Sequence, residues 1–171
     1  KWLMINSIEP SPFDPAVCYV AGTLYKTGDF KPYLYKTSDY GKTWVSITSG
    51  IEKEHFTRVL RADPARKGLL YAGTETGMYI SFDDGKSWNS FQLNLPEVPI
   101  TDLTLKENSL IVATQGRSLW MLDDLTVLHQ LNSNAEKDQI TLFKPKDSYR
   151  TQGGSSKPSL TQGTNLPNGV I

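Results

Sequence analysis

The ten residues YKTSDYGKTW at positions 35–44 return as YISFDDGKSW at positions 79–88, which is 44 residues later. Repeats of about 40 to 45 residues have the length of one β-propeller blade, a sheet of short strands. Upstream, FDPAVCYVAGT (13–23) corresponds in the same way to ADPARKGLLYAGT (62–74). The matching residues of the two phrases are Thr37 and Ser81, Asp39 and Asp83, Gly41 and Gly85, Thr43 and Ser87, and Trp44 and Trp88.

A third and fainter copy follows in SLIVATQGRSLWMLDD at positions 109–124. There Trp120 takes the place of Tyr79 and Asp124 the place of Asp83, whereas the glycine and the closing tryptophan of the phrase are absent. The repeats therefore predict three blades, at about residues 1–50, 51–94 and 95–131, of which the last is irregular.

Each unit reads as short strands, because runs of β-branched and aromatic residues alternate with clusters of Gly, Pro, Asn and Asp, and no stretch has a sustained helical period. The predicted class is all-β, a partial β-propeller of four-stranded antiparallel blades. The strands expected in the second unit are 56–62, 69–74, 77–82 and 87–93, and those in the third are 100–106, 109–114 and 118–122, with 140–144 as a displaced outer strand.

The repeated phrase is typical of a hairpin between the third and fourth strands of a blade. Gly41 and Gly85 can adopt a positive φ without steric cost. Asp39 and Asp83 are short carboxylates that can accept hydrogen bonds from turn N–H groups, and the hydroxyls at positions 37 and 81 can bind the turn to its neighbours. Trp44 and Trp88 are expected to return large apolar surfaces to the core between blades.

Composition excludes several classes of function. The 171 residues contain 18 basic and 18 acidic residues, so no excess of positive charge indicates a nucleic-acid partner. No apolar run is long enough to span a bilayer. Cys18 is the single cysteine and there are two histidines, so we expect no internal disulfide, no metal site and no cofactor.

The pattern S/T-x-D-x-G-x-T/S-W resembles the Asp-box, or bacterial neuraminidase repeat (BNR), of the propellers of sialidases, xyloglucan-degrading glycosidases and sortilin-type receptors. The closest resemblance is to large bacterial proteins described as sortilin-like or BNR-repeat glycosyl hydrolases. It rests on INSIEPSPFD (5–14), PYLYKTSDYGKTW (32–44), LLYAGTETGMYISFDDG (69–85) and ATQGRSLWMLDDL (113–125). The resemblance implies the last blades of a propeller, structural Asp-boxes on the rim away from the functional face, and a periplasmic or secreted location.

Residues 132–171 are rich in Ser, Gln, Asn, Lys and Gly, and are expected to hold the outer strand and a poorly ordered linker toward a further C-terminal domain. The chain does not begin with Met, and three blades fall short of the four to eight that close a propeller. We therefore expect a piece of a longer protein, with the remaining blades supplied by the longer chain or by self-association.

Ligand-binding residues are expected on the loops opposite the Asp-boxes. The loop TLYKTGDFKPYLY (23–35) is longer than its counterpart TETGMY (74–79). Its aromatic and charged residues suit a glycan or a peptide. The alternative is a surface loop with these residues and no binding role. The candidates are Tyr25, Lys26, Asp29, Phe30, Tyr33, His55, Arg58, Glu75 and Arg117.

Two functions remain open from the sequence. The first is a module that binds glycan or peptide on the loop face. The second is part of a glycoside hydrolase, in which two carboxylic groups flank the scissile bond and are shared with missing blades. Fold alone does not choose between them. The carboxylates available on the predicted face are Asp29, Glu52, Glu54, Glu75, Glu97 and Asp102, and the catalytic pair is not identified.

Overall fold

The computed structural model of this chain describes residues 2–131 and 140–147. The chain divides into two compact units, Lys1–Leu125 and Thr126–Ile171. The first unit contains antiparallel sheets and the second contains the short helix α1 (Thr126–Gln130). The predicted all-β class is confirmed.

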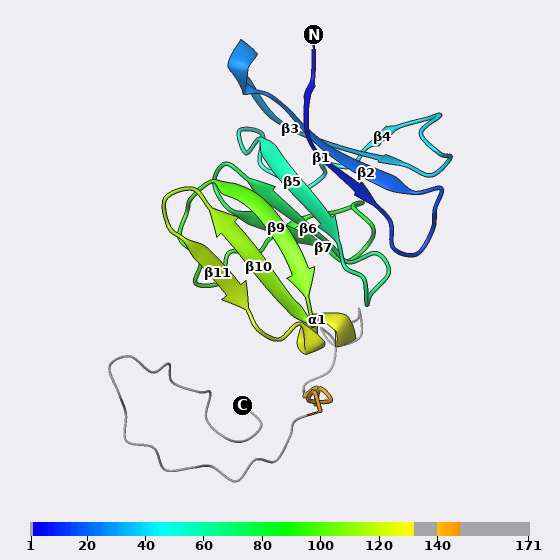
Figure 1. The fold of residues 1–171 in the computed structure, drawn as a ribbon, viewed down its shortest axis with the longest axis vertical. Coiled ribbons are helices and arrows are strands. Elements are labelled where there is room, and N and C mark those ends of the chain that lie inside the picture. Colours follow the sequence, from blue (N-terminus) through cyan, green and yellow to red (C-terminus); the bar gives the residue numbers. More distant parts are fainter. Residues whose placement is uncertain (1, 132–139, 148–171) are drawn as a thin grey trace. The chain divides into compact units, whose positions relative to one another are not determined.

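The first two sheets each have four strands in sequential order (Figure 1). The first sheet consists of β1 (Met4–Pro10), β2 (Cys18–Leu24), β3 (Asp29–Thr37) and β4 (Val45–Ser46), with the 3-10 turn η1 (Tyr25–Thr27) between β2 and β3. The second consists of β5 (Thr57–Ala62), β6 (Leu70–Thr74), β7 (Met78–Ser81) and β8 (Asn89–Ser90).

The third sheet has three strands, β9 (Ile100–Lys106), β10 (Ser109–Thr114) and β11 (Leu119–Leu122). Val112 pairs with Trp120 as Ala72 pairs with Tyr79, which places Trp120 where the sequence alignment predicted. A third copy of the repeated hairpin does not form. The chain that follows Asp124 instead enters α1.

Two predicted strands differ from the structure. The strand expected at 87–93 is reduced to β8, because the hairpin turn extends to Trp88 and the chain leaves the sheet after Phe91, whose N–H still bonds to Met78 O at 2.9 Å. Residues 140–144 form no strand, so the outer strand predicted there is wrong. In that segment Ile140 and Leu142 are almost fully exposed, and the Lys144 backbone bonds to the Gln130 side chain rather than to a strand.

The two repeated hairpins, residues 37–44 and 81–88, have the same set of hydrogen bonds. The Asp83 carboxylate accepts from Ser81 Oγ at 2.9 Å, Ser87 N at 2.9 Å and Ser87 Oγ at 2.6 Å. Asp39 accepts the corresponding bonds at 2.8, 2.8 and 2.6 Å, and the Thr43 hydroxyl is the main reason that its pKa falls to about 2. Burial opposes this effect at Asp83, but the same bonds still hold its pKa below the ordinary value.

The tryptophans that close the two hairpins differ in their surroundings. Trp88 is 3 % exposed, and its indole N–H donates to Ile47 O in the first sheet at 2.7 Å. The Trp88 backbone lies so close to Gly50 that a Cβ there would approach Trp88 O to 2.2 Å. Trp44 is 43 % exposed and bonds only locally, to Gly41 O. Trp44 therefore does not enter a core between sheets, contrary to the prediction, because no sheet among the described residues lies on its side.

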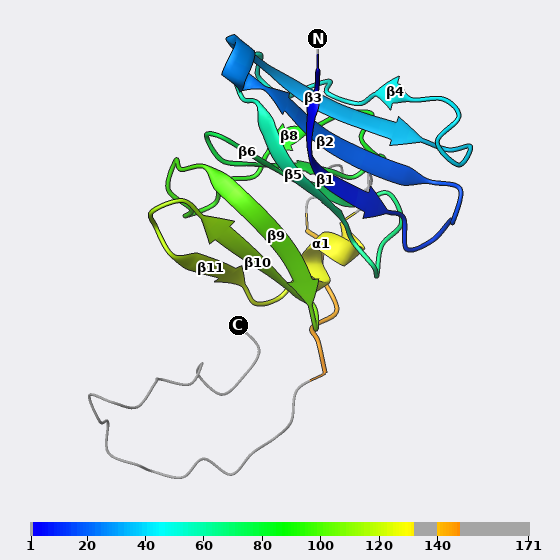
Figure 2. The same ribbon diagram turned by 45° about the horizontal axis from the view of Figure 1, so that its top comes forward.

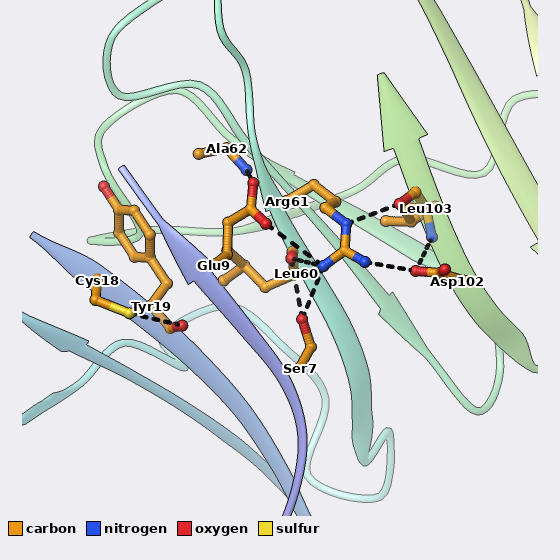
Figure 3. Close-up of polar contacts among 9 residues, drawn as sticks. All are labelled: Ser7, Glu9, Cys18, Tyr19, Leu60, Arg61, Ala62, Asp102 and Leu103. Carbon is orange, nitrogen blue, oxygen red and sulfur yellow. Dashed lines mark hydrogen bonds and ion pairs between the residues drawn. The ribbon is translucent and has the colours of Figure 1, made fainter. Parts of the chain in front are cut away.

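The inner strands β1, β5 and β9 come from three different sheets and lie side by side (Figures 1 and 2). Arg61 on β5 extends between the other two (Figure 3). Its guanidinium donates to Asp102 Oδ1 at 2.7 Å and Leu103 O at 2.8 Å on β9, and to Ser7 Oγ at 2.9 Å on β1. Glu9 lies 3.5 Å from Arg61, and burial raises the pKa of this carboxyl. One side chain thus joins all three sheets.

We predict that Trp88→Ala lowers the free energy of unfolding by roughly 3 to 5 kcal/mol, the usual cost of deleting a buried indole. Trp44→Ala, at the same hairpin position but half-exposed, should cost no more than about 1 kcal/mol. Urea denaturation of both variants checks this. Equal losses would show that Trp88 does not hold the two sheets together.

We predict that Asp83→Ala lowers the free energy of unfolding at pH 7 by roughly 1 to 3 kcal/mol, because the Ser81 and Ser87 donors lose their acceptor. Since the folded-state pKa lies below the unfolded value, the contribution is present at neutral pH and is lost as the pH falls through the folded pKa. The difference between variant and parent should therefore narrow in acid. Asp123→Ala, which removes an exposed carboxylate directly after β11, is the control in the same denaturation series.

Candidate functional site

The loops that connect the second and third strands of each sheet lie at one end of the sheets, and the repeated hairpins lie at the other. In β3, Asp29 pairs with Leu24 beside the loop, whereas Thr37 at the far end pairs with Cys18 and opens the hairpin. We call the end formed by residues 25–28, 52–56, 75–77 and 115–118 the loop face. The candidate ligand-binding residues all belong to this end or border it.

Phe56 is the centre of an aromatic cluster on the loop face. The Tyr25 ring stacks on it at 5.1 Å between centroids, with 14° between the planes, and the Phe30 ring lies tilted at 6.1 Å. The Arg58 guanidinium carbon lies 5.4 Å from the Phe56 centroid, within the range of a cation–π contact. Phe56 itself is buried, whereas Phe30 is 50 % exposed. The cluster therefore presents aromatic surface to solvent on a fixed base.

Arg58 and Glu75 form an ion pair beside this cluster. Arg58 Nε donates to Glu75 Oε2 at 2.6 Å and Nη2 lies 2.5 Å from the same oxygen. The backbone N–H of Glu75 also donates to Phe56 O at 3.1 Å, which joins the β6–β7 loop to the start of β5. Both side chains keep a quarter to a third of their surface exposed, so they are positioned but still accessible. We name Tyr25, Phe30, Phe56, Arg58 and Glu75 the Phe56 cluster.

Asp29 and Tyr33 form a second contact next to Phe30. The Tyr33 hydroxyl donates to Asp29 Oδ2 at 2.8 Å, and this hydrogen bond raises the pKa of Tyr33. Asp29 and Phe30 line an open hollow of about 390 Å³ together with Gly28, Lys31, Lys53 and Glu54. Lys26 lies in η1 and is exposed.

His55 belongs to a separate hollow of about 320 Å³, whose lining includes Glu52, Tyr79, Gln92 and Glu97. His55 Nδ1 and the Tyr79 hydroxyl share a hydrogen bond of 2.8 Å, and Glu52 Oε2 lies 3.5 Å from His55 Nε2. Gln92 donates to Leu95 O and Pro96 O, at 2.9 and 2.8 Å, and so holds the loop that carries Glu97. We call this the His55 hollow.

Arg117 is apart from both groups. It lies in the exposed β10–β11 turn, where its N–H bonds to Thr114 Oγ1 and its carbonyl accepts from Trp120 Nε1 at 2.9 Å. The structure thus brings Tyr25, Phe30, Arg58 and Glu75 together, and places Arg117 on the third sheet.

Phe56 was not among the candidates that sequence reasoning selected. The available signal was its position directly after His55, in the connection that leads into the inner strand β5. What the sequence did not show is that the long first loop folds over this ring, which follows from η1 and the left-handed Gly28 that ends it.

The six candidate carboxylates differ in what they contact. Glu75 and Asp102 are paired with Arg58 and Arg61, and Asp29 is bonded to Tyr33. Glu54 lines the hollow beside Phe30, whereas Glu52 and Glu97 line the His55 hollow together. Asp29 and Glu54 thus share the hollow beside Phe30, and Glu52 and Glu97 share the His55 hollow.

Within residues 2–131 and 140–147, no three His, Cys, Asp or Glu side chains are grouped so that they could hold a metal ion. Burial raises the pKa of the Cys18 thiol, and its Sγ donates to Tyr19 O at 3.6 Å (Figure 3). This environment is the opposite of one that activates a thiolate. No helix in the described part of the chain is long and apolar enough to cross a membrane.

The chain matches no protein-family model, and no curated protein matches it. Among solved structures it is similar to the GH74 enzyme of Niastella koreensis (TM-score 0.55, 14 % identity, 70 % of this chain and 21 % of that one). It is also similar to an ancestral GH74 enzyme (0.53, 20 %, 67 % and 14 %) and to YCF48 of Cyanidioschyzon merolae (0.51, 17 %, 71 % and 34 %).

These proteins have β-propeller folds. The chain is a partial β-propeller, and its sheets are blades. At these identities the likeness establishes the fold alone. The chain spans between 14 % and 34 % of the length of these three proteins.

Proposed function

We propose that this chain is the ligand-binding segment of an Asp-box β-propeller, whose loop face binds an extended glycan or peptide. The observation that carries the proposal is the Phe56 cluster, in which exposed aromatic surface stands beside the Arg58–Glu75 ion pair. A ring can stack on the apolar face of a pyranose or on an apolar side chain, while neighbouring charges bond hydroxyls or backbone amides.

The rigidity of the cluster supports a binding role. Phe56 is buried beneath Tyr25 and Phe30, and Arg58 is held by both the ring and Glu75. A surface that is ordered before the ligand arrives loses less conformational entropy on binding. The hollow of about 390 Å³ next to Phe30 extends this surface and offers Lys31, Lys53 and Glu54 as polar partners.

The identical bonding of the two repeated hairpins supports the Asp-box assignment. In each copy the carboxylate accepts from the hydroxyl two residues before it and from both the N–H and the hydroxyl four residues after it. Every oxygen of Asp39 and Asp83 has a partner within its own turn, which suits a structural role on the face opposite the ligand. The proposed organisation is three blades within residues 1–131, joined to further blades and, through residues 132–171, to a further domain.

A second candidate function rests on the His55 hollow. Glycoside hydrolysis needs two carboxyl groups on either side of a bond. Glu52 and Glu97 line one cavity, and His55 and Tyr79 are hydrogen-bonded within it. In this alternative the segment belongs to a glycosidase that shares its site with other blades.

We predict that Phe30→Ala weakens ligand binding by roughly tenfold or more, the usual loss at an aromatic contact residue, without changing the unfolding midpoint. Ligands are first identified on glycan and peptide arrays and then titrated by calorimetry. Phe13→Ala is the matched control, because Phe13 is 43 % exposed, compared with 50 % for Phe30, and lies at the hairpin end. Unchanged binding by Phe30→Ala, or equal losses in both variants, would contradict the proposal.

We expect that the chain binds its glycan or peptide without cleaving it, so polysaccharides incubated with it should release no reducing ends. If hydrolysis is detected, the second candidate predicts that Glu52→Gln and Glu97→Gln each abolish it, while Glu54→Gln, in the other hollow, retains it. If the parent chain releases reducing ends and both Glu52→Gln and Glu97→Gln lose this activity, the hydrolase proposal would replace the binding proposal. An equal loss of hydrolysis in all three variants, Glu54→Gln included, would exclude the His55 hollow as the catalytic site.

A further inference from the structure

An apolar groove lies between the second and third blades, on the side away from the inner strands. Its lining comes from the end of the second blade, at Phe91, Leu93 and Leu95, and from the third blade, at Leu110, Val112 and Trp120. Neither the ligand-binding proposal nor its alternative uses this groove. The corresponding space between the first and second blades is occupied.

Trp88 occupies that first space. It packs in one core cluster with Ile47 and Ile51 of the first blade and with Leu70 and Tyr79 of its own blade. Its indole N–H donates to Ile47 O at 2.7 Å, and its backbone N–H donates to Ser49 O at 2.9 Å. An indole and two hydrogen bonds therefore close the junction.

The first wall of the groove repeats the first wall of the Trp88 site. The 44-residue repeat that places Trp88 opposite Trp44 also places Phe91 opposite Ile47, and Leu93 opposite Ser49. The backbone agrees, because Phe91 N donates to Met78 O at 2.9 Å just as Ile47 N donates to Leu34 O at 2.9 Å.

The second wall repeats as well. Leu110 and Val112 on β10 pair with Leu122 and Trp120 on β11. In the second blade, Leu70 and Ala72 pair with Ser81 and Tyr79 in the same order. Both walls of the Trp88 site are thus present a second time, one blade further along the chain.

The third blade lacks what fills this space elsewhere. The repeated hairpin phrase with its closing tryptophan, the counterpart of Trp88, does not occur in this blade, and the chain enters α1 after Leu125. β11 is consequently an edge strand, and its Leu119 and Met121 side chains are largely exposed. Within residues 2–125 neither the groove nor the open edge receives a fourth strand.

We propose that this groove binds an extended segment of a partner polypeptide, which adds a fourth strand to β11 and inserts a tryptophan between the blades. The groove repeats the Trp88 junction one blade further along the chain, and this continuity specifies the chemistry of the occupant. Its indole N–H would donate to Phe91 O and its backbone N–H to Leu93 O, as Trp88 donates to Ile47 and Ser49. Main-chain pairing with an exposed strand edge supplies affinity, and the side-chain pocket supplies specificity.

The chain itself provides the probe for this proposal. A peptide with the sequence GKSWNSFQL, which is that of residues 85–93, carries the tryptophan and strand that close the first junction. It is titrated into the full chain, and the backbone amide shifts are followed by NMR. We expect saturable shifts confined to residues 91–95 and 119–122, and roughly tenfold or weaker binding of the Trp→Ala peptide.

Leu93→Asn tests the groove from the protein side. Leu93 is 67 % exposed with a φ of 46°, a conformation that Asn tolerates better than Leu, so the fold should persist while an apolar wall is lost. The control is Ile8→Asn on β1, where the side chain is 65 % exposed and lies away from the groove. We expect weaker peptide binding only in Leu93→Asn.

Three results would overturn the proposal. The first is the absence of saturable shifts at residues 91–95 and 119–122, which includes the case in which this chain's own later residues already fill the groove. The second is equal affinity for the tryptophan and alanine peptides. The third is a set of amide shifts centred on Trp44 and β1 instead of β11. Each of these leaves the ligand-binding proposal on the loop face unaffected.

Discussion

The packing of the Trp88 indole against the first blade is the contact on which the arrangement of the blades depends. It buries the largest aromatic side chain of the repeat, satisfies the indole N–H with Ile47 O, and requires a glycine at position 50 for close approach. The hairpin that presents Trp88 is held by the Asp83 carboxylate, whose bonds lie within the turn. Local turn chemistry therefore positions a residue that acts between sheets.

Arg61 complements this contact at the inner edge. A guanidinium has five N–H donors in a fixed plane, and here they bond to Ser7, Leu60, Leu103 and Asp102 on three strands of three blades. The Arg61 side chain is 24 % exposed, so it joins the three strands while keeping partial contact with solvent. With the inner strands joined in this way, the loops at the other end of the blades can vary, and the Phe56 cluster is built on them.

Sequence reasoning predicted several strands to within one residue of their bounds. The predicted strands 100–106 and 109–114 match β9 and β10, and the predicted strands 56–62 and 69–74 differ from β5 and β6 by one residue at their starts. The outer strand at 140–144 was wrong, because an apolar run forms a strand only if it pairs with a neighbouring strand, and here the Lys144 backbone bonds to the Gln130 side chain instead. The candidate site was found in part: four of its residues surround Phe56, a residue that the loop pattern did not identify.

The sequence by itself determined the repeat, because two segments 44 residues apart have nearly the same residues, and it determined the turn chemistry and the all-β class, because these depend on residues close together in the chain. Only the tertiary structure decided which of two equivalent tryptophans is buried, since Trp44 and Trp88 differ in the sheet beside them and not in their own hairpins. It likewise decided that Phe56, Arg58 and Glu75 meet, and that the third blade leaves a groove. These features are contacts between segments far apart in the chain, and a local sequence pattern does not show which distant segments meet.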